Sequence, residues 1–289
     1  MSDRFRVLFY FVLFGWRQIF GDSEVAVRSL PALFGFFATL LTYFTARYCF
    51  DKRRSLWSFL LISTSAYCVF YSQELRDYSM LMFLAAAQLF CLSRALSPPK
   101  RGSVLWFRVL FALLVAVGLF ANILTVYFIA ALAVAHILAV RRLKAWLSWW
   151  APAAGLSVLP ALFYMSASAS SAPETIITGR LKASIFQHFS YSIYGFVSGT
   201  TYGPPPDQLR GDGKLQTMLQ YWPWMLLLLL VLLALVGMLV ALMNHRWGAS
   251  PPNVVDQFLV YTVLFTCGFA VLFVYGTKMD WLPRHLCYL

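Results

Sequence analysis

The chain has 289 residues, of which 61% are hydrophobic and only 12% are charged. Soluble domains carry roughly 25% charged residues, so this chain has too few charges to cover a water-facing surface, and a soluble fold is excluded. The formal net charge of +12 would suggest a nucleic-acid partner in a soluble protein, but in a membrane protein it is typical of basic cytoplasmic loops.

Eight apolar stretches are candidates for membrane-spanning helices, because about 20 apolar residues are needed to cross the hydrocarbon core. In chain order they cover residues 29–46, 56–71, 78–96, 104–121, 123–140, 147–165, 221–243 and 257–275. The sequence therefore predicts an all-α, polytopic transmembrane helix bundle of about eight spans.

Two shorter apolar segments, 5–20 and 184–196, are interpreted as interfacial helices that lie flat on the membrane. A signal peptide is the alternative for the first, since Arg4 and Arg6 precede its apolar run. We describe the chain as one transmembrane domain with four parts. These are an interfacial helix and loop (1–28), a six-span core (29–165), a long extracytoplasmic loop (166–220) and the C-terminal spans (221–289).

Basic residues gather in alternate loops, which predicts the orientation of the spans. The loops after the first, third, fifth and seventh spans hold 12 of the 23 Lys and Arg, namely Arg47, Lys52, Arg53, Arg54, Arg94, Lys100, Arg101, Arg108, Arg141, Arg142, Lys144 and Arg246. Loops rich in Lys and Arg stay in the cytoplasm. The other connections, including the turn at Asn122, the loop 166–220 and both chain ends, are therefore expected on the extracytoplasmic face.

The most informative segment reads YSQELRDY, from Tyr71 to Tyr78, and it lies between the second and third predicted spans. Glu74, Arg76 and Asp77 place three charges within four positions at the mouth of two spans. Charged groups are costly in lipid, so such a cluster suggests a functional site. Two alternatives stay open: Arg76 could pair with a neighbouring carboxylate to stabilise a turn, and the two tyrosines could belong to an interfacial aromatic belt.

The stretch from Trp16 to Leu96 resembles the bacterial membrane glycosyltransferases related to protein O-mannosyltransferases and lipid A aminoarabinose transferases, a GT-C superfamily similar to glycosyltransferase family 39. WRQIFGDSEVAVRSLPALFG resembles the helix–loop–span junction of that family, and YSQELRDYSMLMFLAAAQLFCLSRAL resembles its YSQEARMY-type motif with the following span. PRHLCYL, near the end, resembles its Pro-Arg-Tyr-Leu entry to a late span. The other spans match in hydropathy only.

The resemblance implies transfer of a sugar, a hexosyl or pentosyl group, from a polyprenyl-phosphate donor to a glycan, lipid or protein acceptor. The expected location is the bacterial inner membrane, with the reaction at its extracytoplasmic face. The carrier phosphate is expected to bind Arg28, Arg76 and Arg284, because the planar arginine fork matches phosphate oxygens. Arg28 could instead snorkel to lipid headgroups, and Arg284 could anchor the start of a span.

Glu74 is the expected catalytic residue, either as a base or by orienting Arg76 or the acceptor. The expected substrate-binding residues are Tyr71, Gln73, Asp77, Tyr78 and His285, although His285 could be an ordinary interfacial residue. Asp22 and Glu24, in the GDSE loop, are interpreted as part of a helix N-cap for the first span, because Asp and Ser side chains accept from the free backbone N–H groups there. The five Cys and four His lack metal-binding spacing, so we predict no protein-bound metal and no certain cofactor, and a divalent metal with the substrate stays open.

The sequence departs from the family pattern at its start. The general base of the family is an acidic residue in a first extracytoplasmic loop, which continues into a His-Pro-Pro or Lys-Pro-Pro sequence; Phe5, Arg6 and Val7 stand at the latter positions, and Asp3 lies next to the terminus. Both ends look cut, so we expect a fragment of a larger membrane protein, whose own activity is in question. The alternative function is a non-catalytic or degenerate protein that binds or transports polyprenyl lipids.

Overall fold

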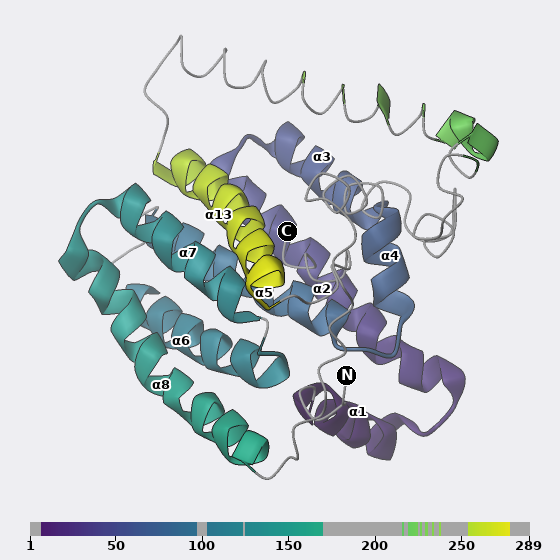
Figure 1. The fold of residues 1–289 in the computed structure, drawn as a ribbon, viewed down its shortest axis with the longest axis horizontal. Coiled ribbons are helices and arrows are strands. Elements are labelled where there is room, and N and C mark those ends of the chain that lie inside the picture. Colours follow the sequence, from purple (N-terminus) through teal and green to yellow (C-terminus); the bar gives the residue numbers. More distant parts are fainter. Residues whose placement is uncertain are drawn as a thin grey trace.

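The computed structural model describes residues 7–96, 103–123, 125–169 and 254–277, together with scattered positions between 216 and 237. All regular secondary structure in this part of the chain is helical, which confirms the predicted all-α fold there. The helices pack side by side in a bundle, with one helix crossing its end (Figure 1).

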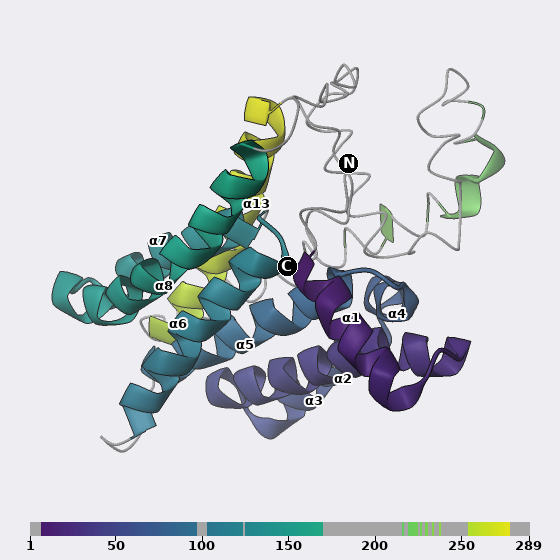
Figure 2. The same cartoon turned by 90° about the horizontal axis from the view of Figure 1, so that it is seen from below.

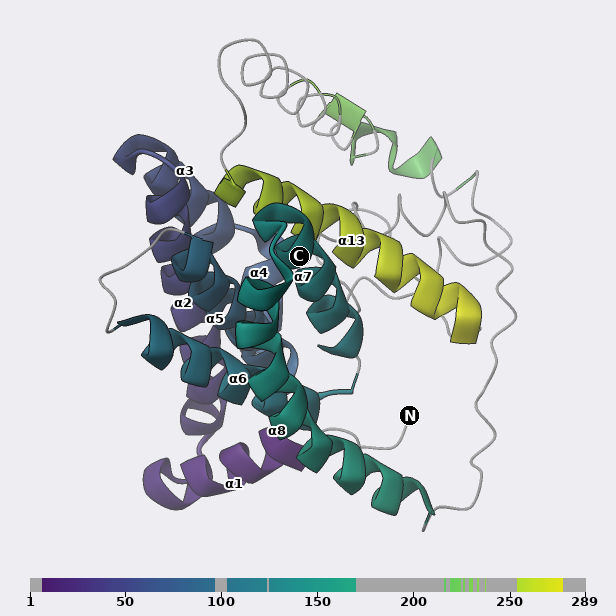
Figure 3. The same ribbon diagram turned by 90° about the vertical axis from the view of Figure 1, so that its left-hand side faces the viewer.

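Helix α1 (Val7–Phe20) covers most of the segment that was predicted to be interfacial. Gly21 follows it with φ of +86°, a left-handed conformation that suits glycine and ends the helix. Helix α2 (Glu24–Cys49) then begins with Ser23 as its N-cap. Figure 3 shows α1 lying across the end of the bundle, at a steep angle to α2. This arrangement fits an interfacial helix, and a position at the membrane surface stays a prediction.

The second predicted span, 56–71, is not one straight helix. It is divided into α3 (Lys52–Ser63) and α4 (Ala66–Gln73), which are bent by 52° at the break between them. The break has a local cause. The Thr64 hydroxyl donates to the carbonyl one turn earlier at 2.7 Å, and Ser65 caps the new helix. Side-chain bonds of this kind compete with the helical ladder, and hydropathy does not reveal them.

The remaining helices each overlap a predicted span: α5 (Tyr78–Leu96), α6 (Ser103–Ala121), α7 (Thr125–Val140), α8 (Leu143–Ala169) and α13 (Val254–Thr277). Helix α5 is central, since it packs against both α2 and α6, while α8 packs on α6 and α13 on α7. Figure 2 shows α1 on one side of this group and the pair α7 and α13 on the other.

The predicted number of about eight spans is not confirmed. Within the described residues, Glu24–Cys49 and Val104–Ala121 are long and apolar enough to cross a membrane, and the bent pair α3–α4 would add a third span. Helices α5 and α7 are apolar but shorter by the same measure. The predicted interfacial segment 184–196 and most of the predicted span 221–243 lie outside the described residues.

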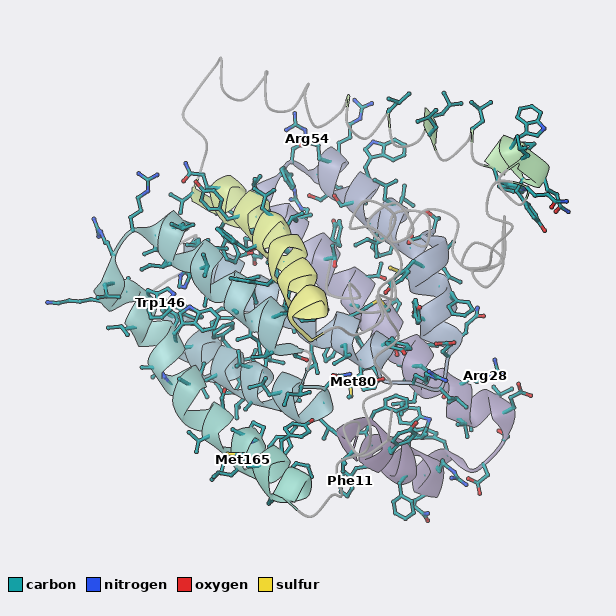
Figure 4. The ribbon with its side chains drawn as sticks, viewed as in Figure 1. Phe11, Arg28, Arg54, Met80, Trp146 and Met165 are labelled. Carbon is teal, nitrogen blue, oxygen red and sulfur yellow. The ribbon has the colours of Figure 1, made fainter. Side chains whose placement is uncertain are left out.

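The helix connections lie at two ends of the bundle. We call the end with the α1–α2, α4–α5 and α6–α7 connections the turn end, and the end with the α2–α3 and α7–α8 connections the basic end. Arg28 lies at the turn end and Arg54 at the basic end (Figure 4). The basic end carries exposed cationic side chains, among them Arg53 and Arg141, so the bundle separates the YSQELRDY segment from this basic surface.

Buried polar side chains connect the helices inside the bundle. Gln88 of α5, which is fully buried, donates from Nε2 to the carbonyl of Leu114 on α6 at 3.0 Å. Trp150 of α8 donates from Nε1 to Nδ1 of His136 on α7 at 3.0 Å. Hydrogen bonds in apolar surroundings fix which residues of neighbouring helices face one another. The first bond fixes the register of α5 against α6, and the second that of α7 against α8.

Candidate functional site

The YSQELRDY segment forms the tight connection between α4 and α5. Glu74 follows the last residue of α4 in an extended conformation, and the Arg76 N–H donates to the Glu74 carbonyl at 2.8 Å. The Leu81 N–H donates to the Asp77 carbonyl at 2.9 Å, so Asp77 begins α5. The chain reverses within four residues, leaving Gln73 and Arg76 exposed and Glu74 half-buried at the turn end.

The two tyrosines of the segment pack inside the bundle rather than in an aromatic belt. Tyr71 is 8% exposed and Tyr78 is 3% exposed. Their rings meet edge to face, with centroids 4.7 Å apart, and Tyr67 packs on the other side of Tyr71 at 4.5 Å. Such aromatic pairs contribute about 0.5–1.5 kcal/mol each beyond the area that they bury. They hold the end of α4 against the start of α5.

Arg76 is the exposed cation of the turn, and its surroundings favour the charged form. The nearby Tyr78 hydroxyl raises the pKa of Arg76, and Glu74 and Tyr10 act in the same direction. Tyr10 belongs to α1, so this interaction brings the crossing helix close to the turn. The guanidinium has water access and is available to an anion in the headgroup region.

Asp77 differs from the other two charged residues, because its side chain is fully buried. Its Oδ2 accepts a hydrogen bond from Nδ2 of Asn122, at 2.9 Å. Asn122 lies in the α6–α7 connection, 45 residues further along the chain. The structure therefore divides the predicted charge cluster, with Arg76 facing outward and Asp77 joined to a second turn of the bundle.

Arg28 lies on the first turns of α2, at the same end of the molecule. Its Nη2 is 2.9 Å from Oε1 of Glu24, and both side chains are largely exposed. An exposed pair of this kind contributes little to stability, so Arg28 can exchange Glu24 for another anion. Of the site residues predicted from sequence, Arg28 and the residues from Tyr71 to Tyr78 lie within the described part, and Arg284 and His285 lie outside it.

The GDSE loop caps α2 through a different residue than the flanking acids. The Ser23 hydroxyl accepts from the Ala26 N–H at 3.2 Å. Asp22 turns back to Arg17 at the end of α1, with Nε and Oδ1 2.5 Å apart. This hydrogen bond, together with the charge of Arg17, lowers the pKa of Asp22. The N-cap expected in this loop is confirmed, with Ser23 as the capping residue, while Asp22 precedes the cap and pairs with Arg17 instead.

Sequence reasoning did not identify two residues that contact this turn. Tyr10 was placed only within an interfacial helix, and Asn122 was noted only as the site of a turn. The available signal for Asn122 was a lone amide between two strongly apolar stretches. No group of three His, Cys, Asp or Glu side chains that could hold a metal ion occurs in the described ranges.

An all-helical bundle that includes helices long and apolar enough to cross a membrane is typical of an integral membrane protein. Comparison with protein families makes this specific. The chain belongs to the dolichyl-phosphate-mannose-protein mannosyltransferase family, whose model matches residues 7–167, from α1 into α8. This confirms the resemblance seen in the sequence. Comparison with curated proteins and with solved structures gave no match.

The matched region contains α1, the complete YSQELRDY turn and Asn122. Membership implies glycosyl transfer from a polyprenyl-phosphate-linked sugar to an acceptor in a membrane setting. At this level the predicted enzyme class and membrane location are supported. The donor sugar, the acceptor and the residues that bind the carrier belong to the proposal that follows.

Proposed function

We propose that this protein transfers a sugar from a polyprenyl-phosphate carrier to a glycan, lipid or protein acceptor at the turn end of the bundle. In this proposal the turn end faces the extracytoplasmic side of a bacterial inner membrane, and the basic end lies in the cytoplasm. The distribution of exposed cations supports this orientation, since Arg53, Arg54, Arg141 and Arg142 all lie at the basic end.

The observation that carries the proposal is the position of Arg76. It is exposed, its pKa is raised, and it lies where apolar helices meet the end of the bundle. A polyprenyl tail needs apolar helix surface, and its phosphate needs a cation at headgroup depth. Arg76 offers a planar donor fork that suits phosphate oxygens. The same contact would stabilise the phosphate as the leaving group when the sugar departs.

Glu74 lies two residues before this cation and, unlike the neighbouring Asp77, its side chain is not fully buried. It is half-buried, and its negative charge contributes to the raised pKa of Arg76. A general base must reach within about 2.6–3.2 Å of the proton that it removes. Glu74 could meet this requirement for an acceptor hydroxyl at the turn, or it could orient Arg76.

Arg28 is proposed as a second phosphate ligand, and Arg284 keeps that role on sequence grounds.

A second candidate function is binding of polyprenyl phosphate without catalysis. One observation favours it: three acidic side chains at the turn end already have partners. Asp22 pairs with Arg17, Glu24 with Arg28, and Asp77 with Asn122. The remaining described candidate for a base is Glu74, which also interacts with Arg76.

The two candidates are separated by measuring binding and turnover on the same preparation. The purified protein is placed in lipid nanodiscs with a polyprenyl phosphate that carries radiolabelled mannose, and with the acceptors of a bacterial membrane extract. Native mass spectrometry measures binding, and label that leaves the carrier measures transfer. Turnover is the result expected for the enzyme. Binding without turnover, for mannose and for a panel of other sugars, would favour the lipid-binding alternative, and the absence of both would contradict each candidate.

A further inference from the structure

The hydrogen bond between Asp77 and Asn122 joins two turns that are distant in sequence. Asp77 is fully buried and Asn122 is 8% exposed, and their side chains lie 2.9 Å apart. A hydrogen bond that includes a carboxylate is roughly twice as strong as one between two neutral groups. This bond joins the YSQELRDY turn to a residue outside it, in a different connection of the bundle.

The α6–α7 turn that carries Asn122 is itself fixed by hydrogen bonds. The Asn122 N–H donates to the Gly118 carbonyl at 3.0 Å, and the Thr125 N–H donates to the Asn122 carbonyl at 3.0 Å. The Thr125 hydroxyl also donates to the Gly118 carbonyl at 3.0 Å. From α8, the Tyr164 hydroxyl donates to the Phe120 carbonyl at 3.1 Å. Asn122 therefore provides a fixed support at the junction of three helices.

Arg76 directly precedes Asp77, so fixing the backbone at Asp77 also restricts where the backbone of Arg76 can lie. The carbonyl of Asp77 begins α5, and the N–H of Arg76 is bonded to the Glu74 carbonyl. A long arginine side chain loses conformational freedom when it is immobilised by a ligand, and this loss opposes binding. If the turn were mobile, its backbone would also have to be ordered on binding. With a fixed backbone, the guanidinium is already near its binding position before the ligand arrives.

We infer that Asp77 and Asn122 are a positioning pair, which locks the α4–α5 turn onto the α6–α7 turn and so holds Arg76 where a lipid phosphate binds. The inference assigns Asp77 a role other than direct contact with substrate. It rests on the proposed function for the identity of the ligand, while the locking of the turn is a property of the protein alone.

A simpler explanation is that Asp77 only caps α5, since Asp is favoured at helix N-termini. Asp77→Ser separates the two roles: serine is an equally good cap, but its side chain is shorter and loses the bond to Asn122. Asp77→Asn keeps the reach and removes the charge. Asn122→Asp places two carboxyl groups together in a buried site, and the double variant Asp77→Asn/Asn122→Asp restores a carboxyl–amide pair with the two groups exchanged.

The test measures two quantities for all of these variants. Hydrogen exchange in a peptide that covers residues 71–82 reports on the turn, and native mass spectrometry with polyprenyl phosphate reports on the affinity. For Asp77→Ser and Asn122→Asp we expect faster exchange in the turn and an affinity at least about 10-fold lower, the loss expected for one charged hydrogen bond. The double variant is expected to recover both properties to within about threefold of wild type.

Two results would overturn the inference. One is wild-type exchange and affinity in Asp77→Ser, which would leave only the capping role. The other is faster exchange in Asp77→Ser with unchanged affinity, because a purely structural bond would give that result. Failure of the proposed function looks different: wild-type protein would bind no polyprenyl phosphate, and the exchange data would still decide whether the pair locks the turn.

Discussion

Ser72 of α4 occupies the space that Gly35 of α2 leaves by having no side chain. A Cβ atom built at Gly35 would lie 2.8 Å from the Cβ of Ser72 and closer still to its hydroxyl. The Ser72 hydroxyl is also bonded to the Cys68 carbonyl, at 2.6 Å. This close approach brings α4, with the YSQELRDY turn at its end, directly against the first long helix.

We therefore expect Gly35→Ala to move α4 away from α2. The added methyl group meets atoms near the α4 backbone rather than a flexible side-chain tip, and overpacking of this kind costs about 1–3 kcal/mol. The expected result is a lower melting temperature together with weaker binding of polyprenyl phosphate. Gly155→Ala on α8 is the matched control, since no atom lies within 4 Å of its added Cβ. Equal melting temperatures for the two variants would show that the contact is not tight.

The second prediction concerns Arg76, the proposed phosphate ligand. Arg76→Ala is expected to abolish transfer and to weaken binding of polyprenyl phosphate by about 10-fold or more, because a charged hydrogen-bond donor is lost. Arg76→Lys is expected to have a transfer rate and a carrier affinity between those of wild type and Arg76→Ala, since lysine keeps the charge but lacks the planar fork. Both variants should insert into the membrane normally.

Arg53→Ala is the control for this series, because Arg53 is an exposed arginine at the basic end. It is expected to bind and turn over substrate like wild type. Unchanged activity in Arg76→Ala would remove Arg76 from the site, and lost activity in a correctly inserted Arg53→Ala would contradict the assigned orientation.

The third prediction separates the possible roles of Glu74. If this carboxylate acts on the acceptor, Glu74→Gln removes the charge at nearly constant size and lowers kcat more than it changes carrier affinity. General acid–base catalysis typically contributes 10²–10⁴-fold, so we expect a loss of about 100-fold. Turnover and carrier binding are measured on one preparation. A loss confined to carrier affinity would instead show that Glu74 serves to orient Arg76.

The fourth prediction concerns the attachment of α1. Trp16 donates from Nε1 to the Ala26 carbonyl at 2.8 Å and is 3.2 Å from the Ser29 hydroxyl. Trp16→Phe keeps most of the ring and removes the donor, which costs about 0.5–1.5 kcal/mol. Hydrogen exchange in α1 is expected to increase while exchange in α5 does not change. Trp106→Phe serves as the control, because Trp106 is 68% exposed and its substitution should leave α1 as it is.

Hydropathy predicted the bounds of a helix well where the change from polar to apolar residues coincides with the end of the helix. The predicted span 78–96 matches α5 because a charged turn ends immediately before Tyr78. The predicted span 29–46 was too short, because α2 continues through polar residues such as Glu24 and Arg47 at its two ends. A helix is limited by its backbone hydrogen bonds, and polar side chains at its ends simply reach water.

The candidate site could be predicted in part only. The residues from Tyr71 to Tyr78 are contiguous, so their proximity needed no knowledge of the fold. The bond between Asp77 and Asn122 depends on how α5 and α6 pack, and that geometry is absent from a single sequence. The same holds for Gly35 and Ser72, whose contact requires knowing which faces of α2 and α4 meet.

The bend between α3 and α4 affects how deep the turn lies in the bilayer. At 1.5 Å per residue, the 12 residues of α3 extend about 18 Å and the 8 residues of α4 about 12 Å. With α4 inclined by 52°, it advances only about 7 Å along the axis of α3. Thr64 and Ser65, between the two helices, add about 3 Å. The pair thus covers about 28 Å, slightly less than the roughly 30 Å of a typical hydrocarbon core. The bilayer is expected to thin beside α4, which would bring a lipid phosphate down to the level of Arg76.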